Sequence, residues 1–458
     1  MKTLLLFLIA VSVIFSCKKN DFIKSPDAVL SFSTDSLKFD TVFTSVGSVT
    51  KSFKIINNNK QKILADVKLI GGINSSFKTN IDGEATPQKT NLEIPAEDSI
   101  YVFVTLQINP TTQNLPFIVS DSISVKFNNN ERFIQLEGFG QNANFLRNQT
   151  ISSNTTWDNL LPYVILNGVK VAENATLTIE SGTKIFFHAN SPMLVDGTLL
   201  VNGQHSNPVI FSGDRLDEYY RDLPGSWPGI YFSESSKSNK MVFAEIKNPF
   251  VGISAISSNN NLTPQLILEQ SKIYNAYDAG IQLTATFANV SNSLIYNCAT
   301  NIKIREGGNY NFTFNTIASY SSQYLFRTNP VLSVYNFNDE QTVSQNLNAN
   351  FTNCIFWGNG GLVENEVDVI KQGAGDFNVV FDHCIYKANS NPESITFIAS
   401  LRNQDPNFEL IDVINNDYDF HVSAGPVIDN GIEVPFSYDL DNNPRVVGLP
   451  DIGAYEKQ

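Results

Sequence analysis

The second half of the chain repeats a short phrase in which a polar residue precedes a small residue and then apolar residues. Its five copies are Gln270-Ser271-Lys272-Ile273, Asn292-Ser293-Leu294-Ile295, Asn315-Thr316-Ile317-Ala318, Asn353-Cys354-Ile355-Phe356 and His383-Cys384-Ile385-Tyr386. The intervals from Ser271 to Ser293 and on to Thr316 are 22 and 23 residues. This is the length of one coil of a right-handed parallel β-helix, where the same site recurs on every coil. The spacing therefore predicts a β-helix.

The same period occurs earlier in the chain. Two further phrases, Ala175-Thr176-Leu177-Thr178-Ile179 and Gly197-Thr198-Leu199-Leu200-Val201, lie 22 residues apart. We therefore expect the β-helix to occupy residues 161–404, and its core to arise from stacking, because one coil alone cannot bury its inner face. Longer intervals, 38 residues from Thr316 to Cys354 and 30 from Cys354 to Cys384, predict excursions from the coil. Such insertions often form the binding surface of a repeat protein.

Each position of the phrase predicts a column of side chains across the coils. We expect an amide ladder at a turn, in which each side chain bonds to its neighbour. Its members would be Gln270, Asn292, Asn315 and Asn353, with His383 at its end. Cys354 and Cys384 share the column of Ser271, Ser293 and Thr316, which predicts small, buried, inert thiols. With Cys298, an odd number of cysteines follows Cys17, and a disulfide between neighbouring coils stays open.

The first part of the chain shows a different pattern, with short strand-like runs between turn clusters. Examples are Ser52-Phe53-Lys54-Ile55-Ile56 before three Asn residues and Ser99-Ile100-Tyr101-Val102-Phe103-Val104 before Asn109-Pro110. Seven or so strands at this spacing predict a β-sandwich over residues 28–143. Residues 144–160, rich in Asn, Ser and Thr, are expected to be a linker. The fold class is therefore all-β, with a sandwich followed by a β-helix.

Composition and charge exclude some classes of partner. Of the 458 residues, 42% are hydrophobic and 17% are charged, which is typical of a folded chain with a large core. The formal net charge is -14. Binding to nucleic acid is therefore not expected, because neutralising phosphates requires a basic surface.

The N-terminus predicts export. Lys2 precedes an apolar run from Leu4 to Phe15 that is too short to span a bilayer, and Cys17 follows Ser16. This segment resembles a bacterial lipoprotein signal, which implies a signal peptide over residues 1–16, lipidation of Cys17, a tether over 17–27 and a membrane as partner through the lipid anchor. The alternative is an ordinary cleaved signal with an incidental Cys. The resemblance implies an outer-membrane lipoprotein of the cell envelope, with the periplasmic or external face left undecided.

Two further segments carry resemblances. Phe39-Asp40-Thr41-Val42-Phe43, Val46-Gly47-Ser48-Val49, Asp98-Ser99-Ile100-Tyr101-Val102 and Gly138-Phe139-Gly140-Gln141-Asn142-Ala143 resemble an immunoglobulin-like module at the start of Bacteroidota surface lipoproteins. Asp405-Pro406-Asn407-Phe408, Gly425-Pro426-Val427-Ile428-Asp429-Asn430-Gly431 and Pro450-Asp451-Ile452-Gly453-Ala454-Tyr455-Glu456 resemble the end of Bacteroidota right-handed β-helix lipoproteins of the pectin-lyase-like superfamily. The first resemblance implies a spacer without catalytic residues. The second implies that residues 405–458 cap the last coil.

The segment 213–229 interrupts the coils and is the first candidate for a ligand-binding site. Carboxylates and aromatic rings alternate there, which suits carbohydrate: rings cover the apolar face of a sugar, while carboxylates and Arg bond to hydroxyls. The candidate residues are Asp214, Arg215, Asp217, Glu218, Tyr219, Tyr220 and Trp227. The alternative is a loop that packs on the coils through Leu216 and Tyr219, with Arg215 or Arg221 in ion pairs.

Catalytic patterns of the superfamily are harder to find. Its lyases use Lys or Arg as base, often beside calcium, and its glycosidases use paired carboxylic acids. Lys303 and Arg305 alternate along one strand and could face outward with Asp278 on the preceding coil, but a solvated strand face explains them better, because exposed strand positions are normally polar. We therefore expect non-catalytic binding of glycan or another surface component. A polysaccharide lyase or glycoside hydrolase, and a structural adhesin or stalk, are the alternatives.

Metal and cofactor motifs are not expected. The segment Asp439-Leu440-Asp441-Asn442-Asn443 begins like a calcium loop, but Pro444 stands where such a loop needs Gly. The four His residues are scattered without ligand spacing, which argues against zinc. No cofactor is predicted, and calcium is the one ion left open.

Overall fold

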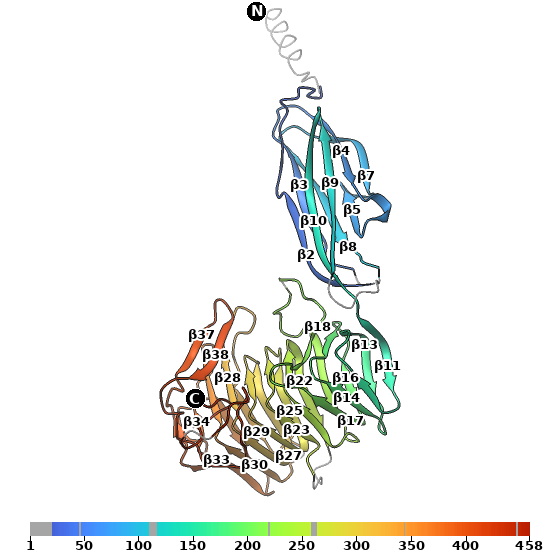
Figure 1. Ribbon diagram of the computed structural model, residues 1–458. Helices are drawn as coiled ribbons and strands as arrows, with labels where there is room; N and C mark the ends of the chain where they lie inside the picture. The colour runs from blue at the N-terminus through green and yellow to red at the C-terminus, as the bar shows by residue number, and fades with distance from the viewer. Residues whose placement is uncertain are drawn as a thin grey trace, which may run out of the picture. The chain divides into compact units, whose positions relative to one another are not determined.

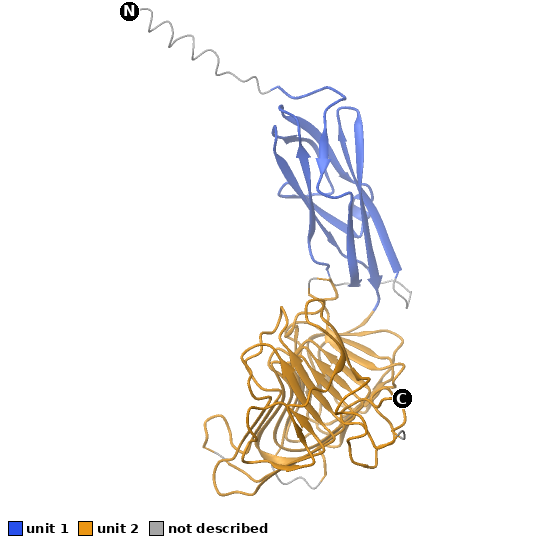
Figure 2. Ribbon diagram, turned by 90° about the vertical axis from the view of Figure 1, so that its left-hand side faces the viewer, with its two compact units in different colours: residues 1–142 blue, residues 143–458 orange. Residues whose placement is uncertain are grey.

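The computed structural model describes residues 21–44, 47–109, 117–218, 220–257, 263–342, 344–445 and 448–458. Within them the secondary structure is strand, apart from the single 3-10 turn Gly72–Asn74. The prediction of an all-β chain is confirmed. The chain divides into two compact units, residues 1–142 and 143–458 (Figure 2).

The first unit contains two five-stranded sheets, ordered β1-β3-β8-β5-β6 and β2-β10-β9-β4-β7. The strands are β1 (Leu30–Phe32), β2 (Ser36–Phe43), β3 (Lys51–Asn57), β4 (Ile63–Leu69), β5 (Phe77–Ile81), β6 (Glu84–Ala85), β7 (Gln88–Ile94), β8 (Ser99–Leu106), β9 (Phe117–Phe127) and β10 (Asn130–Gln141). In β8 the buried Val102 and Val104 alternate with the exposed Tyr101 and Phe103. One core contains side chains from both sheets, so the unit is a β-sandwich.

The predicted tether over residues 17–27 is partly attached to the sandwich. Phe22 forms a parallel bridge with Lys62, and the backbone nitrogen of Ile23 donates to the carbonyl of Lys62 at 2.8 Å. The Asn128 amide donates to the carbonyls of Ile23 and Ser25 at 2.8 and 3.0 Å. Residues 22–25 therefore belong to the folded unit, whereas Cys17 lies outside the described residues.

The second unit contains one sheet of 26 strands, and strands of successive coils pair in parallel (Figure 1). Its first strands are β11 (Asn144–Ile151), β12 (Thr155–Trp157), β13 (Tyr163–Val171), β14 (Thr176–Glu180), β15 (Lys184–Phe187), β16 (Met193–Val195), β17 (Thr198–Asn202), β18 (Val209–Gly213), β19 (Trp227–Phe232), β20 (Asn239–Val242), β21 (Ala244–Lys247), β22 (Pro249–Ile256) and β23 (Leu266–Glu269). The others are β24 (Lys272–Tyr274), β25 (Ala279–Ser291), β26 (Leu294–Tyr296), β27 (Thr300–Thr313), β28 (Thr316–Tyr320), β29 (Leu332–Tyr335), β30 (Leu347–Thr352), β31 (Ile355–Asn359), β32 (Val367–Ile370), β33 (Phe377–Asp382), β34 (Ile385–Tyr386), β35 (Thr396–Ile398) and β36 (Leu401–Arg402). This arrangement is consistent with a β-helix.

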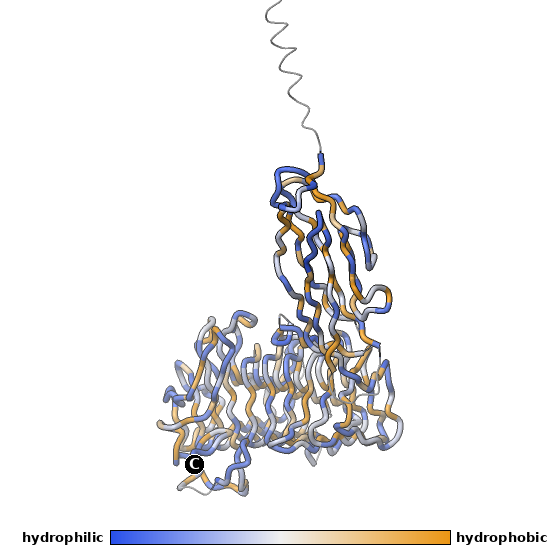
Figure 3. The backbone as a smooth tube through the Cα atoms, turned by 45° about the horizontal axis from the view of Figure 1, so that its top comes forward, coloured by the Kyte–Doolittle hydropathy of each residue, from blue (hydrophilic) through white to orange (hydrophobic). Residues whose placement is uncertain are grey.

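The core of this unit runs along the inside of the coils. One inward column consists of Ile273, Ile295, Ile317, Phe356 and Tyr386, which are paired in register and at most 2% exposed. Figure 3 shows hydrophobic and hydrophilic segments alternating along these strands. Stacking of alternating strands therefore creates the core, as the period predicted.

Residues 144–160 are not the predicted linker. Strand β11 pairs with β13, and β12 pairs with β14. Trp157 at the end of β12 is 4% exposed and stacks on Tyr163, with ring centroids 4.5 Å apart. The polar composition wrongly indicated a linker. The outward residues of this first coil are Asn, Ser and Thr, and only a few inward apolar residues are needed to pair it with the next coil.

The register of the third phrase differs from the prediction by one residue. Thr316 pairs with Leu294, so Asn315, and not Thr316, shares the column of Ser293. Asn315 accepts a hydrogen bond from the Ser293 nitrogen at 3.0 Å, and Phe314 takes the turn position with φ 56°. The inward burial of Ile317 fixes this register, because a slip of one residue would turn Ile317 to the outside.

The predicted amide ladder at that turn is absent in the described coils, and three of its five side chains bond to the C-terminal segment instead. Gln270 donates to the carbonyl of Asp439 at 2.7 Å, Asn292 accepts from Arg445, and Asn353 donates to the carbonyl of Ile432 at 2.8 Å. Amide ladders occur at other positions. Asn275 donates to Asn248 at 2.6 Å, and Asn311 donates to Asn289 at 3.0 Å.

The C-terminal segment, residues 405–458, lies along the side of several coils, and Leu401 of the last coil packs against the same core. It contains the antiparallel pair β37 (Phe408–Asp412) and β38 (Asp417–Val422). Its apolar residues share a core with outward side chains of β26, β28, β31 and β34. The members are Leu294, Ala318, Tyr320, Ile355, Trp357 and Ile385 from the coils and Phe420, Val422, Val427, Leu440, Ile452, Ala454 and Tyr455 from the segment. The predicted cap is thus a lateral cover.

The three cysteines of the described chain are free and buried. Cys354 and Cys384 precede paired strands on neighbouring coils, as the phrase predicted. Burial raises the pKa of the Cys298 thiol to about 12. These properties are those of inert buried thiols.

Candidate functional site

The outward side chains of β22, β25, β27, β29 and β32 form a polar surface across successive coils. Their inward neighbours are fully or nearly fully buried, so alternation turns the next residue of each strand outward. One outward column reads Ser254, Gln282, Lys303, Ser333 and Asp368, and the next contains Thr284, Arg305 and Tyr335. We call these eight residues the polar face. Lys303 and Arg305 therefore point to the same side, as predicted.

Lys303 is paired with Asp278, as the sequence suggested. Its ammonium lies 2.5 Å from a carboxylate oxygen of Asp278, which is the residue before β25 on the preceding coil. The Asp278 backbone nitrogen donates to the carbonyl of Phe250 at 2.9 Å, which fixes the start of the strand. The Lys303 side chain is only 20% exposed. The ammonium is thus held in place beside its carboxylate.

Arg305 is fixed by a different set of partners. Its guanidinium lies over the ring of Tyr335 at 4.1 Å from the centroid and donates to the Ser333 hydroxyl at 3.1 Å. A carboxylate oxygen of Asp339 lies 3.6 Å from it. The Tyr335 hydroxyl donates to Asp368, and burial together with this carboxylate raises the pKa of Tyr335. Arg305 and Tyr335 therefore form a rigid, flat element of the polar face.

An exposed pair of aromatic rings borders Asp278. Phe250 and Tyr277 are 45% and 54% exposed, and their ring centroids are 5.4 Å apart with an interplanar angle of 27°. Sequence analysis did not single out this pair. The spacing of the coils contained the information needed to predict this pair, because Phe250 and the Tyr277-Asp278 dipeptide occupy neighbouring places on successive coils. Two large apolar side chains kept in solvent at a strand start suit a ligand with an apolar face.

Within the loop candidate, Trp227 has a structural role. It is fully buried, its indole nitrogen donates to the carbonyl of Lys247 at 2.8 Å, and its ring stacks on Phe187 with centroids 4.2 Å apart. A ligand in solvent cannot reach this side chain. The predicted binding role of Trp227 is therefore wrong, because the residue begins β19 and faces inward.

The charged residues of the loop bond largely to one another. The Asp214 carboxylate accepts a hydrogen bond from the ring of His188 at 2.8 Å, and Arg215 donates to Asp217 at 2.9 Å. The Arg215 guanidinium also lies 3.8 Å from the ring centroid of Tyr220. Glu218 is exposed, and Tyr219 lies outside the described residues. The alternative prediction of Arg215 in an ion pair is confirmed.

The end of the loop is anchored beside the aromatic pair. Asn248 and Asn275, which bond to each other, donate to the carbonyls of Arg221 and Asp222 at 2.6 and 2.7 Å. Gly225 approaches Tyr277 so closely that an added Cβ would lie 3.2 Å from the Tyr277 Cβ. The loop, the aromatic pair and Asp278 are therefore contiguous. Two candidates that were separate in the sequence adjoin in the fold.

Other acidic side chains do not converge. Glu245 and Glu269 have separate partners: Glu245 accepts from the Tyr274 hydroxyl at 2.5 Å, and Glu269 pairs with Lys240 at 2.9 Å. Asp439 accepts from the Asn443 nitrogen at 2.6 Å, which closes a turn. Among the residues that the structure describes, no three His, Cys, Asp or Glu side chains gather as metal ligands. The described ranges also contain no helix long and apolar enough to cross a membrane.

No protein-family model and no curated protein matches this chain. Among solved structures, a family 123 glycoside hydrolase from Clostridium perfringens, studied for glycolipid glycan hydrolysis, is 9% identical over 26% of this chain and 26% of its own, with a TM-score of 0.18. The CupB6 tip adhesin from Pseudomonas aeruginosa is 11% identical over 23% and 39%, with a TM-score of 0.18. The CooA pilin subunit from enterotoxigenic Escherichia coli is 8% identical over 24% and 97%, also at 0.18. The chain spans about a quarter of the hydrolase, and TM-scores this low carry no functional conclusion.

Proposed function

We propose that the second unit is a β-helix that binds glycan, without catalysis, on its polar face and on the adjoining aromatic pair Phe250 and Tyr277. The observation that carries this proposal is the exposed pair of Phe250 and Tyr277 beside the fixed Asp278–Lys303 pair. Stacked rings can cover the apolar face of a sugar, while a carboxylate and an ammonium held in place bond to its hydroxyl groups. Fixed side chains lose little entropy when the ligand binds, which favours affinity.

The contacts of the two basic side chains, Lys303 and Arg305, favour binding without catalysis. A lyase needs a basic side chain that is available to take a proton from the substrate. Lys303 is engaged by Asp278, and Arg305 is engaged by Tyr335, Ser333 and Asp339. These contacts suit recognition of hydroxyl groups better than proton transfer. The polar face is therefore proposed as a recognition surface.

The proposal also includes the cellular location of the protein and the role of the first unit. The N-terminal sequence supports lipidation of Cys17 and anchorage in the outer membrane of a Bacteroidota-like bacterium. The sandwich would be an immunoglobulin-like spacer, and the β-helix would be right-handed and related to the pectin-lyase-like superfamily. Right-handedness is supported by physics, since about 98% of parallel crossovers within a sheet have that hand.

The first experiment incubates the protein lacking residues 1–17 with a panel of acidic and neutral polysaccharides. Retardation in affinity gels would measure binding, and assays for unsaturated and reducing ends would measure cleavage. We expect binding without products. New chain ends would overturn the non-catalytic proposal in favour of a lyase or hydrolase. Neither binding nor cleavage of any polysaccharide would favour the structural stalk.

A matched pair of variants locates the binding site. The double variant Phe250→Ala/Tyr277→Ala should weaken retention roughly tenfold or more, because exposed aromatic anchors dominate such contacts. The control is Tyr101→Ala/Phe103→Ala in the sandwich, which removes a stacked pair of similar exposure, 43% and 40%, with centroids 5.6 Å apart. Equal loss in both double variants, or no loss in the first, would exclude the pair of Phe250 and Tyr277 as the glycan anchor.

A further inference from the structure

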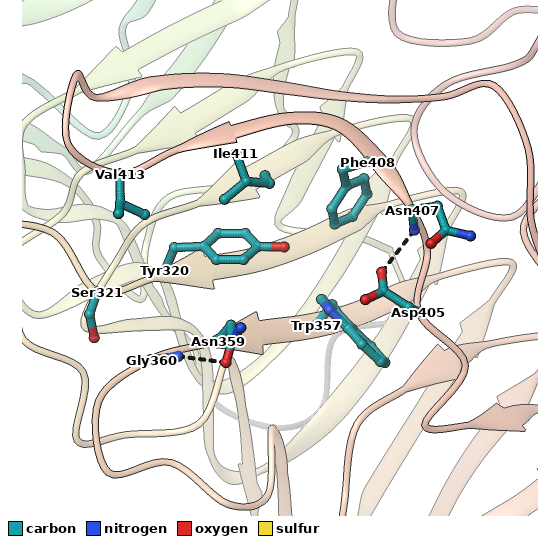
Figure 4. A pocket seen from close by; sticks show the side chains of 10 residues that line it. All are labelled: Tyr320, Ser321, Trp357, Asn359, Gly360, Asp405, Asn407, Phe408, Ile411 and Val413. Atoms are coloured by element: carbon teal, nitrogen blue, oxygen red, sulfur yellow. Dashed lines mark hydrogen bonds between the residues drawn. The ribbon is translucent and has the colours of Figure 1, made fainter.

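A second candidate site lies on another side of the coils, where the C-terminal segment leaves a hollow of about 560 Å³. It lies between β28 and β31 on one side and β37 with the residues before it on the other (Figure 4). The volume falls within the range of about 300–1,000 Å³ typical of small-molecule sites. None of its lining residues belongs to the polar face, so this inference is independent of the proposed function.

Aromatic rings form much of its wall. Tyr320 and Trp357 are 9% and 8% exposed, so each ring is backed by protein and presents a limited surface to the hollow. Figure 4 shows the Tyr320 ring between Ile411 and Phe408 on one side and Trp357 and Asn359 on the other. Phe408 is held by an edge contact with Phe420, with centroids 5.1 Å apart. The walls are therefore apolar, flat and fixed.

Polar groups meet at the same hollow with hydrogen-bonding capacity left over. One Asp405 oxygen accepts from the Asn407 nitrogen at 2.9 Å, and the Asn359 side-chain oxygen accepts from the Gly360 nitrogen at 2.9 Å. The other Asp405 oxygen, the Asn359 amide nitrogen and the Tyr320 hydroxyl have no hydrogen-bond partner among the described residues. Burial, and then the charge of Asp405, raises the pKa of Tyr320, so its hydroxyl stays a donor.

We propose that this hollow binds one pyranose ring of a neutral or amine-bearing sugar. The C–H face of the ring would lie on Trp357 and Tyr320, and hydroxyl or amine groups would donate to Asp405 while Asn359 and Tyr320 donate to ring substituents. Of the lining residues, Asp405 is the one that carries charge. A uronate would place a second carboxylate near it and is disfavoured, because like charges repel in a partly desolvated site.

Ligand-observed saturation-transfer NMR tests the site with the protein lacking residues 1–17. The probes are methyl β-glucopyranoside, glucosamine, methyl β-glucuronide and butylamine, which separate the sugar ring from the bare cation. The two neutral or amine-bearing sugars should receive saturation at their ring protons, and the glucuronide should bind roughly tenfold more weakly. Saturation of butylamine alone would overturn the proposal, as would equal binding of the glucuronide or no binding of any sugar.

Substitutions of two Asp residues in turns of the same type provide a test and its matched control. Asp405 and Asp412 each accept a backbone hydrogen bond from the residue two positions on, at 2.9 and 3.0 Å, but Asp412 does not line the hollow. Asp405→Asn should weaken sugar binding roughly tenfold, because a charged acceptor bonds more strongly than an amide. Asp412→Asn should leave it unchanged. Equal loss in both, or none in Asp405→Asn, would overturn the assignment, and unfolding midpoints of both variants report whether the turn survives.

Discussion

Single residues set the turns between the strands of the second unit. On each coil, the turn residue before the Ser, Asn or Cys column of the repeated phrase has a left-handed φ of 44–56°. These turn residues are Gln270, Asn292, Phe314, Asn353 and His383. Asn adopts this conformation readily, whereas an aromatic residue is strained there. Phe314 is nevertheless fully buried, and the Arg445 guanidinium lies 3.9 Å from its ring centroid. Packing against the C-terminal segment compensates for the strain, which is why the phrase is irregular at this coil.

His421 joins two parts of the C-terminal segment by hydrogen bonds to two carboxylates. Its ring bonds to Asp441 at 2.7 Å and to Asp419 at 2.5 Å, and it packs on Tyr455 with centroids 3.9 Å apart. The hydrogen bond to Asp441, with that to Asp419, raises the pKa of His421 to about 9. The imidazolium therefore joins β38 to the segment around Asp441.

Because the pKa of His421 in the folded state lies above the unfolded value of 6.5, the contribution of His421 to folding stability depends on pH. It is fully present below pH 6.5 and is lost as pH rises through about 9. Urea unfolding of the wild type should show falling stability over this window, and His421→Gln should flatten the dependence. Parallel curves for the two proteins would contradict the proposed role of His421.

At the scale of elements, a glycine allows two strands to come close at the start of the polar face. Gly229 has φ 126° and marks a register shift in the pairing of β19 with β22. A Cβ added there would lie 1.7 Å from the carbonyl oxygen of Val251. The bulge therefore depends on glycine for both conformation and space.

Gly229→Ala should destabilise the second unit by about 2 kcal/mol or more, since both backbone strain and a backbone clash oppose it. The measurement is the midpoint of chemical unfolding followed by Trp fluorescence. Gly47→Ala serves as the control, because an added Cβ meets nothing within 4 Å there. A midpoint unchanged by Gly229→Ala would show that the coil absorbs the clash by a local shift.

At the scale of the second unit, the C-terminal segment ties several coils together. Arg445 and Glu456 form a buried ion pair at 3.1 Å, with each side chain 1% exposed. Arg445 also donates to Asn292 at 3.1 Å and to the carbonyl of Gly453 at 2.9 Å. One guanidinium thus connects the end of the chain to coils more than a hundred residues earlier in the sequence.

Arg445→Ala should lower the free energy of unfolding of this unit by about 3–5 kcal/mol, because it leaves Glu456 buried without its partner. Arg221→Ala, at a side chain 57% exposed, should change it by less than about 1 kcal/mol. Urea titration checks both. A small effect of Arg445→Ala would mean that water reaches Glu456 and that the lateral cover is less firmly attached than its burial indicates.

Strand alternation predicted where some of the candidate residues lie, whereas their role in binding stays a prediction. Lys303, Arg305 and Asp278 were placed together because an outward residue of one coil lies beside that of the next. Phe250, Tyr277, Tyr335 and the hollow at Trp357 were missed, since each depends on a turn length or on the path of the C-terminal segment. Trp227 was misassigned because its position in a loop-like sequence concealed the start of a strand.

The sequence by itself determined the all-β class, the coil period and the inward columns, because backbone geometry and burial repeat them locally on every turn. Only the tertiary structure decided where the end of the chain lies and which outward side chains meet. The reason is physical: the inward columns are set by one repeated requirement, exclusion of water. The lateral cover and the sites depend on single contacts between residues far apart in the chain, such as Arg445 with Asn292.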